Sequence, residues 1–191
     1  MQIHCNKIDV LDSLLCMRKP VKPLLNRLVA ATFDTLWLAL RVKKPSHKIR
    51  MKQAKRVFAR LQCADFQENG GRLFAYVRAI DPFVFEELLL LAFKARGLKV
   101  IHNRRYTGDG GIDGVVVLPN KQRYAIQAKR YKDHVNAQAI KNFATDLTRH
   151  SCSGGFFIHS GKSGASVYHN LPSNVTMISG GNLYRLLVFK E

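Results

Sequence analysis

Hydrophobic and polar positions follow regular helical and extended periods from residue 81 to the end of the chain. Asp81 followed by Pro82 is a typical helix start, because aspartate caps the first backbone N–H groups and proline tolerates the first helical turn. This pair predicts a helix over residues 83–96, which Gly97 ends. The helix carries two acids, Glu86 and Glu87, on an otherwise apolar face.

The segments after Gly97 predict a sheet with helices on both of its faces. Strands are expected over residues 98–102, 115–118, 123–129, 155–159 and 175–178, and helices over 136–150, 163–170 and 182–189. The run over 155–159 is apolar, which suits a strand that is buried on both faces. The order of these elements predicts an α/β fold with a mixed central sheet flanked by helices.

Residues 1–80 differ from residues 81–191, and we expect two domains: a basic, mainly helical N-terminal region and a regular C-terminal part. Nine lysines and arginines and no acidic residue lie between Arg41 and Arg60, and the apolar residues among them recur roughly at helical spacing. Pro45-Ser46 offers a break and an N-cap ahead of this helix. Asn69-Gly70-Gly71 is expected to be a loop that ends the region.

The 191-residue chain has 31 Lys and Arg against 13 Asp and Glu, and its formal charge of +18 favours a polyanionic partner. The basic helix could be a solvated face, a DNA-phosphate contact or an anionic-lipid contact. The expected DNA-binding residues are Lys44, Lys48, Lys52, Lys55, Arg56 and Arg130. Polar and charged residues interrupt the apolar stretch over residues 24–42, so we expect an amphipathic or buried helix there and no membrane span.

Two further patterns exclude classes of protein. The four cysteines form no CxxC pair, so we expect neither a zinc ribbon nor a disulfide framework, and scattered thiols suit the reducing cytoplasm. Ser160-Gly161-Lys162-Ser163 looks like the end of a P-loop, but the motif needs glycine where this chain has Phe156. ATP is therefore not an expected partner.

Polar side chains are expected to meet at one end of the sheet. Asp113 follows a glycine-rich segment and opens one strand of a predicted hairpin, and Gln127 and Lys129 project from the same face of the other strand. A carboxylate holds a hard cation such as Mg²⁺, which polarises a phosphoryl oxygen and lowers the pKa of a bound water. A lysine orients that water or stabilises the developing charge. The three groups therefore suit metal-assisted phosphodiester hydrolysis.

The part from Asp81 to about Leu187 resembles the Mrr-type restriction endonuclease catalytic domain of the PD-(D/E)xK nuclease superfamily. The resemblance rests on Phe85-Glu86, on Gly108-Asp109-Gly110-Gly111-Ile112-Asp113-Gly114 and on Gln127-Ala128-Lys129-Arg130-Tyr131.

That resemblance implies a role for each matching residue. Asp113 would be the principal metal ligand, Gln127 would take the second acidic position in a Q-x-K form of the motif, and Lys129 would be the catalytic lysine. Glu86 would support the metal or its water. The commoner pattern has Asp or Glu in place of Gln127, so the affinity for metal should be weaker here. Glu87 is expected to be a solvated helix acid, and Asp109 a turn-former.

The resemblance implies a DNA endonuclease of the type IV restriction kind, dependent on Mg²⁺ or Mn²⁺ and acting on double-stranded DNA. A non-catalytic DNA-binding protein that keeps the nuclease fold stays open as an alternative, as does a branched-DNA resolvase. Double-strand cleavage commonly needs two active sites, which a homodimer would supply.

Overall fold

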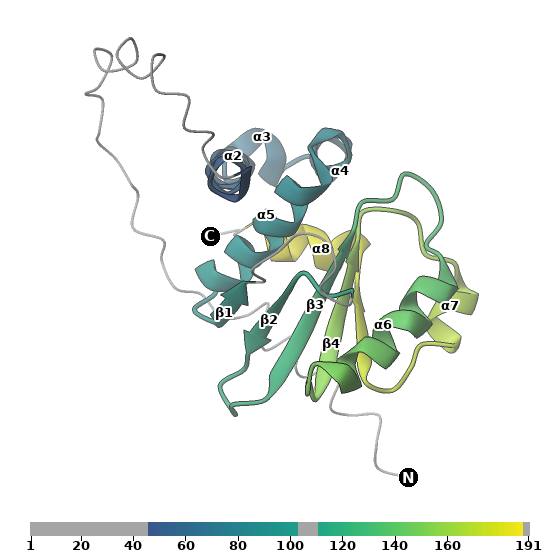
Figure 1. Cartoon of the computed structure of the whole chain (residues 1–191). Coiled ribbons are helices and arrows are strands. Elements are labelled where there is room, and N and C mark those ends of the chain that lie inside the picture. The colour runs from purple at the N-terminus through teal and green to yellow at the C-terminus, as the bar shows by residue number, and fades with distance from the viewer. Residues whose placement is uncertain (1–45, 103–110, 189–191) are drawn as a thin grey trace.

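A five-stranded mixed sheet forms the centre of the computed structural model, which describes residues 46–102 and 111–188 (Figure 1). Its strands are β1 Lys99–His102, β2 Gly114–Val117, β3 Arg123–Lys129, β4 Gly154–His159 and β5 Val175–Ile178. The helices of the described residues are α2 Ser46–Leu61, α3 Ala64–Gln67, α4 Gly70–Ala79, α5 Pro82–Ala95, α6 Ala137–Arg149, α7 Ala165–His169 and α8 Gly180–Leu187.

The strands follow one another in the sheet in chain order, and β3 joins an antiparallel half to a parallel half. β1 pairs with β2 and β2 with β3 in antiparallel fashion, whereas β3, β4 and β5 run parallel. Helices α5 and α8 cover one face of the sheet together with α2 and α4, and α6 and α7 lie on the other face (Figure 1). The predicted mixed sheet with helices on both faces is confirmed.

The predicted start and end of α5 are confirmed by the contacts at its two termini. Asp81 Oδ1 accepts hydrogen bonds from the backbone N–H groups of Phe83 and Val84, at 2.9 and 3.2 Å. Gly97, after the last turn, has a φ of 83°, a left-handed conformation that glycine adopts without steric cost. The burial of most α5 side chains places this helix inside the molecule rather than on its surface.

Two segments that the sequence did not predict to be helical belong to helices, one at Gly70-Gly71 and one at Gly180-Gly181. Asn69 is the N-cap of α4, and its side chain accepts a hydrogen bond from the backbone N–H of Arg72 at 3.0 Å, so Gly70 and Gly71 form the first turn of that helix. The predicted loop at these positions is therefore wrong, because a capping asparagine outweighs the low helix propensity of two glycines. α8 likewise begins at Gly180, two residues before the predicted start.

The basic helix α2 packs its apolar side along α5. Ala54, Val57 and Leu61 are buried in the same hydrophobic cluster as α5 and the sheet, while Ile49 stays 45% exposed. Residues 46–80 thus share a core with the C-terminal part. The division of the chain into two domains at residue 80 stays a prediction.

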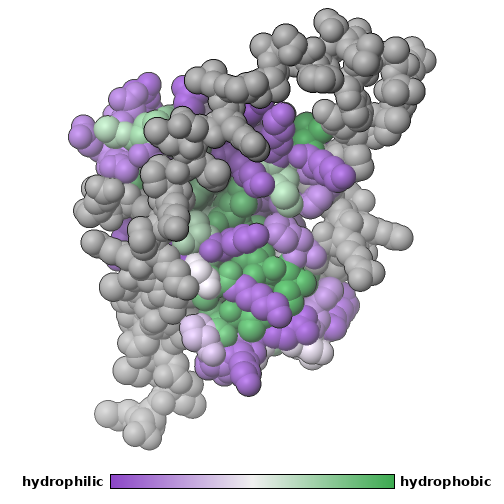
Figure 2. Space-filling model, turned by 90° about the vertical axis from the view of Figure 1, so that its left-hand side faces the viewer, coloured by the Kyte–Doolittle hydropathy of each residue, from purple (hydrophilic) through white to green (hydrophobic). Residues whose placement is uncertain are grey.

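Polar side chains dominate the face of the molecule that carries β1, with a smaller hydrophobic area between them (Figure 2). Within the described ranges, no helix combines the length and the apolarity that crossing a bilayer requires. The apolar stretch over residues 24–42, Lys44 and Asp109 lie outside the described residues.

Candidate active site

Asp113 directly precedes β2 and lies beside the C-terminal end of β3. Its backbone N–H donates to the carbonyl of Ile126 at 2.7 Å, and its Oδ2 accepts a hydrogen bond from the backbone N–H of Ala128 at 2.6 Å. The next residue, Gly114, lies against α5 so closely that a Cβ there would stand 2.7 Å from Leu90 Cδ2. These contacts fix the Asp113 carboxyl group at one end of the sheet.

Gln127 is buried on β3, and the two ends of its amide have different surroundings. The Nε2 group donates to the carbonyl oxygen of Gly111, in the turn before β2. Oε1 is buried and has no hydrogen-bond partner among the described residues. The Gly111 bond therefore sets the orientation of the amide and leaves a buried oxygen available for a ligand.

Lys129 and Glu86 come from separate elements and complete the candidate site. Lys129 is the last residue of β3 and shares a strand face with Gln127, and Glu86 is half-buried on α5. Burial and, to a smaller extent, the charge of Asp113 raise the pKa of Glu86 to about 8, although the charge of Lys129 opposes the rise. The fold thus brings these three groups within electrostatic reach of one another, although 43 positions separate Glu86 from Lys129.

Asp113 shows the same conflict between burial and charge. Burial raises its pKa to about 6, while the N–H of Ala128 and the Lys129 ammonium both act in the opposite direction. Two carboxyl groups with raised pKa values in one partly buried place indicate a site with too little positive charge of its own.

The residues at this end of the sheet fit a hard divalent cation. No three His, Cys, Asp or Glu side chains within residues 46–102 and 111–188 are grouped as a metal centre. Asp113 and Gln127 nevertheless offer two oxygen donors of the kind that Mg²⁺ and Mn²⁺ accept, and the buried Gln127 Oε1 lacks a partner from the described residues. Glu86 is within electrostatic range of Asp113.

The residues expected to bind DNA divide into two groups by exposure. Lys48, Lys52, Lys55 and Arg56 all lie exposed on α2, on the side away from the core. Arg130 is half-buried, and its Nη1 donates to the backbone carbonyl of Arg78 on α4. Among the expected DNA-binding residues that the structure describes, those on α2 are therefore exposed and Arg130 is not.

Glu87 does not lie in solvent as expected but is 3% exposed. Its two carboxylate oxygens face the Nδ1 atoms of His47 on α2 and His102 on β1, at 3.3 and 3.5 Å. Three elements thus meet at one buried acid. Spacing along the chain could not reveal this cluster, because its members come from segments 40 and 15 positions away from Glu87.

His159 lies opposite Lys129 in the pairing of β3 with β4 and is fully buried. Its Nε2 is 3.0 Å from Ser163 Oγ, which lies 3.2 Å from Ser179 Oγ, and Ser179 in turn contacts the hydroxyl of Tyr168 at 3.1 Å. Burial lowers the pKa of His159 to about 4, so the imidazole is neutral at physiological pH.

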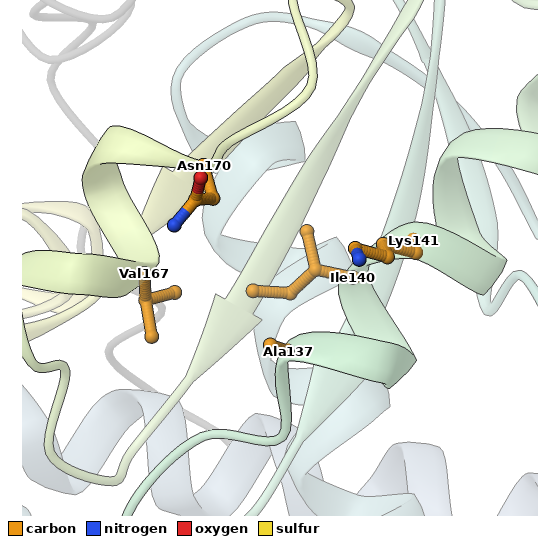
Figure 3. A pocket seen from close by; sticks show the side chains of 5 residues that line it. All are labelled: Ala137, Ile140, Lys141, Val167 and Asn170. Carbon is orange, nitrogen blue, oxygen red and sulfur yellow. The ribbon is translucent and has the colours of Figure 1, made fainter.

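A small pocket of about 110 Å³ lies between α6 and α7 (Figure 3). Its lining residues are Ala137, Ile140, Lys141, Val167 and Asn170. None of the candidate catalytic side chains reaches it. The candidate site is therefore the polar end of β2 and β3 and not this pocket.

The chain is similar to a known protein family and to a solved structure. A family model described as a restriction endonuclease, Mrr_cat, matches residues 77–187, which is more than half of the chain. The solved structure of the MspJI restriction endonuclease in complex with a 27-mer oligonucleotide matches with 17% identity and a TM-score of 0.40, over 83% of this chain and 34% of that one. This chain spans about a third of that protein's length, and no curated protein matches it. The chain belongs to the Mrr-type restriction endonuclease family, and its mixed sheet with flanking helices is the restriction-endonuclease-like fold of that family.

Proposed function

We propose that the protein is a metal-dependent DNA endonuclease of the type IV restriction kind, which hydrolyses phosphodiester bonds of double-stranded DNA at the Asp113 end of the sheet. Membership of the family supports a nuclease. The dependence on Mg²⁺ or Mn²⁺, the roles of single residues and a preference for modified DNA are parts of the proposal.

The amide of Gln127 is the single observation that carries the metal-dependent mechanism. Its nitrogen is bound by the Gly111 carbonyl, and its buried oxygen has no partner within the described part of the chain. An unsatisfied buried oxygen is costly, by about 1–3 kcal/mol, unless a ligand satisfies it. Asp113 at the neighbouring strand start provides a charged oxygen for the same cation.

Each side chain has a separate task in this mechanism. Asp113 and Gln127 would hold the cation, which would supply charge stabilisation and an activated water. Glu86 would accept a hydrogen bond from the attacking water and help to orient it. Lys129, at the end of β3, places its ammonium where negative charge develops on the phosphate oxygens.

The proposal predicts that Asp113→Ala and Lys129→Ala each lower the rate of plasmid cleavage by about 100-fold or more, because each removes a group that acts on the reacting phosphate. Both variants should keep the fold and most of the affinity for DNA, since the α2 surface is unchanged. Cleavage is measured with Mg²⁺ and with Mn²⁺, with EDTA as the metal-free control.

Asp133→Ala and Lys132→Ala are matched controls, because both residues are exposed in the segment after β3. They should cleave at the wild-type rate. Nicking by Asp113→Ala and Lys129→Ala at the wild-type rate would overturn the assignment of these residues. A comparison of methylated with unmethylated plasmids tests the preference for modified DNA, and a four-way junction tests the resolvase alternative.

A non-catalytic DNA-binding protein is the second candidate, because Gln127 brings no negative charge to the metal position. The same assay separates the two functions. A wild-type protein that binds duplex DNA but leaves it intact with either metal would support the second candidate.

A further inference from the structure

Arg50 differs from the other basic residues of α2 in its surroundings. Its guanidinium carbon lies 4.0 Å from the ring centroid of Phe83, which belongs to the first turn of α5. Arg50 is half-buried, whereas Lys48, Lys52 and the basic residues of the following turn are exposed. The stacking on Phe83 restrains the side chain, because arginine packs well over an aromatic face.

The position of Arg50 is also fixed by the packing of α2 against α5. One turn earlier on α2, His47 Nδ1 lies 3.3 Å from the buried Glu87 Oε1. One turn later, Ala54 is completely buried in the common core. The N-terminal half of α2 is therefore held beside the part of α5 that carries the two acids.

This packing places Arg50 at the edge of the candidate active site. Phe83 and Glu86 are three positions apart on α5, so they lie on the same side of that helix. Lys129 and, to a smaller extent, Arg50 lower the pKa of Glu86 through their charges, so both cations lie within electrostatic range of this carboxyl group although they come from different elements.

The charge balance of the site gives Arg50 a role. Asp113 and Glu87 are acids within electrostatic range of Glu86, and Lys129 and Arg50 are cations that act on the same carboxyl group. A guanidinium binds phosphate oxygens through two parallel N–H donors, which suits a backbone phosphate better than a point charge does. A cation at the rim can also offset the repulsion between DNA and these acids.

We propose that Arg50 binds the backbone phosphate next to the scissile phosphate, so that α2 forms one wall of the active site as well as an exposed DNA-binding surface. This inference rests on the proposed nuclease function. It separates Arg50, which positions the substrate, from the exposed DNA-binding residues of α2 that add affinity, which are Lys48, Lys52, Lys55 and Arg56.

The test compares Arg50→Gln and Arg50→Lys with the control Arg60→Gln. Arg60 is a matched control, because it lies on the same helix with its guanidinium carbon 5.1 Å from the Tyr76 ring. Ten residues separate it from Arg50, about 15 Å along the helix axis. Two quantities are measured: the single-turnover rate of duplex cleavage at saturating protein, and the affinity for a duplex oligonucleotide in EDTA at several salt concentrations.

Arg50→Gln should lower the single-turnover rate by about 10- to 100-fold, because the loss of a positioning contact persists when the DNA is fully bound. The slope of the logarithm of affinity against the logarithm of salt concentration should fall by about 1, as expected for one lost phosphate contact. Arg50→Lys should recover the salt slope but only part of the rate. Arg60→Gln should cleave at the wild-type rate.

A folded Arg50→Gln variant with the wild-type rate and the wild-type salt slope would overturn the inference. Circular dichroism checks the fold, and if Arg50→Gln does not fold, Arg50→Lys decides, since a wild-type rate in that variant contradicts the need for two parallel donors. If the wild-type protein cleaves no DNA with either metal, the proposed function fails. The Arg50 contact is then judged by the salt slope alone, where a decrease supports it and an unchanged slope overturns it.

Discussion

At the scale of single residues, the bond between Gln127 and Gly111 gives a reason for an amide at position 127, where the proposed nuclease motif more commonly has a carboxylate. The Gly111 carbonyl accepts the hydrogen bond from Nε2, so it requires a donor on the facing side chain. Gly111 has a φ of 87°, and a Cβ there would stand 2.4 Å from Asp146 Oδ2, so both the backbone conformation and the space favour glycine. The turn before β2 therefore presents a carbonyl oxygen that pairs with the amide N–H of Gln127.

Gln127→Glu restores the charge of the commoner motif but should destabilise the protein. It would turn a buried carboxylate oxygen toward the Gly111 carbonyl, so two acceptors would face each other and a buried hydrogen bond would be lost. The free energy of unfolding in EDTA should fall by about 1–3 kcal/mol.

Urea denaturation measures this change, with Gln53→Glu on the exposed side of α2 as the control. A Gln127→Glu variant as stable as the wild type would show that the Gly111 bond does not select glutamine.

His159 should make the stability of the protein depend on pH. Its pKa is about 4 in the folded protein, against 6.5 as its ordinary value, so between these two values the unfolded chain binds a proton that the folded protein does not. The contribution of His159 to the free energy of unfolding should therefore be largest above pH 6.5 and decrease as the pH falls toward 4. The contributions of Asp113 and Glu86 have the opposite sign, because their pKa values are raised in the folded protein.

The contribution of His159 is about 1–3 kcal/mol between pH 7.5 and pH 4.5. The difference in the free energy of unfolding between the wild type and His159→Gln should shift by this amount over the interval, to the disadvantage of the wild type at the lower pH. The exposed His169→Gln should keep the same difference from the wild type at both pH values. Equal pH dependence of the wild type and His159→Gln, measured by urea denaturation, would contradict a neutral buried imidazole.

At the scale of elements, β3 and α5 place the candidate site. β3 is paired on both sides, antiparallel to β2 and parallel to β4, so its last residues are held rigidly where Asp113 begins the neighbouring segment. α5 supplies Glu86 toward this site and buries Glu87 against α2 and β1. A nuclease site made by these two elements therefore depends on the packing of α2 as well.

Deletion of residues 1–80 should destabilise the remaining sheet. The cut lies at the domain boundary that the change of composition predicts, but it passes through a shared hydrophobic core. It removes Ala54, Val57, Leu61, Leu73 and Val77 from the common core. Each buried Val or Leu contributes about 1.5–3 kcal/mol, and the face of α5 that they cover would become exposed.

The melting temperature of residues 81–191 should therefore lie well below that of residues 46–191, and the shorter fragment should bind a hydrophobic dye. Equal melting temperatures of the two fragments would indicate two independent domains.

At the scale of the whole molecule, the structure assigns parts of the +18 charge to different surroundings. One basic surface on α2 is formed by Lys48, Lys52, Lys55 and Arg56. The guanidinium groups of Arg78 and Arg130 instead donate hydrogen bonds to backbone carbonyls within the protein. Arg96 is buried in the same way, against the carbonyls of Arg185 and Leu186. The net charge therefore overstates the number of basic side chains that are available to bind a polyanion.

The order of the elements could be predicted from the sequence, as could the position of Asp113 beside the end of the strand that carries Gln127 and Lys129. Strands and helices follow hydrophobic periods of two and about 3.6 residues, and the caps at Asp81 and Gly97 are local signals. The weaker predictions concerned glycines at helix starts, as at Gly70 and Gly180, where the helix depends on a cap or on its packing and not on propensity.

Local periodicity and short motifs by themselves determined the α/β fold and the positions of Asp113, Gln127 and Lys129, because such signals need only neighbouring residues. The tertiary structure alone decided that Glu87 is buried between two histidines, that Arg130 binds a backbone carbonyl, and that Arg50 rests on Phe83 beside Glu86. Burial and electrostatic contact depend on distances between segments far apart in the chain, and these distances exist only after the helices have packed on the sheet.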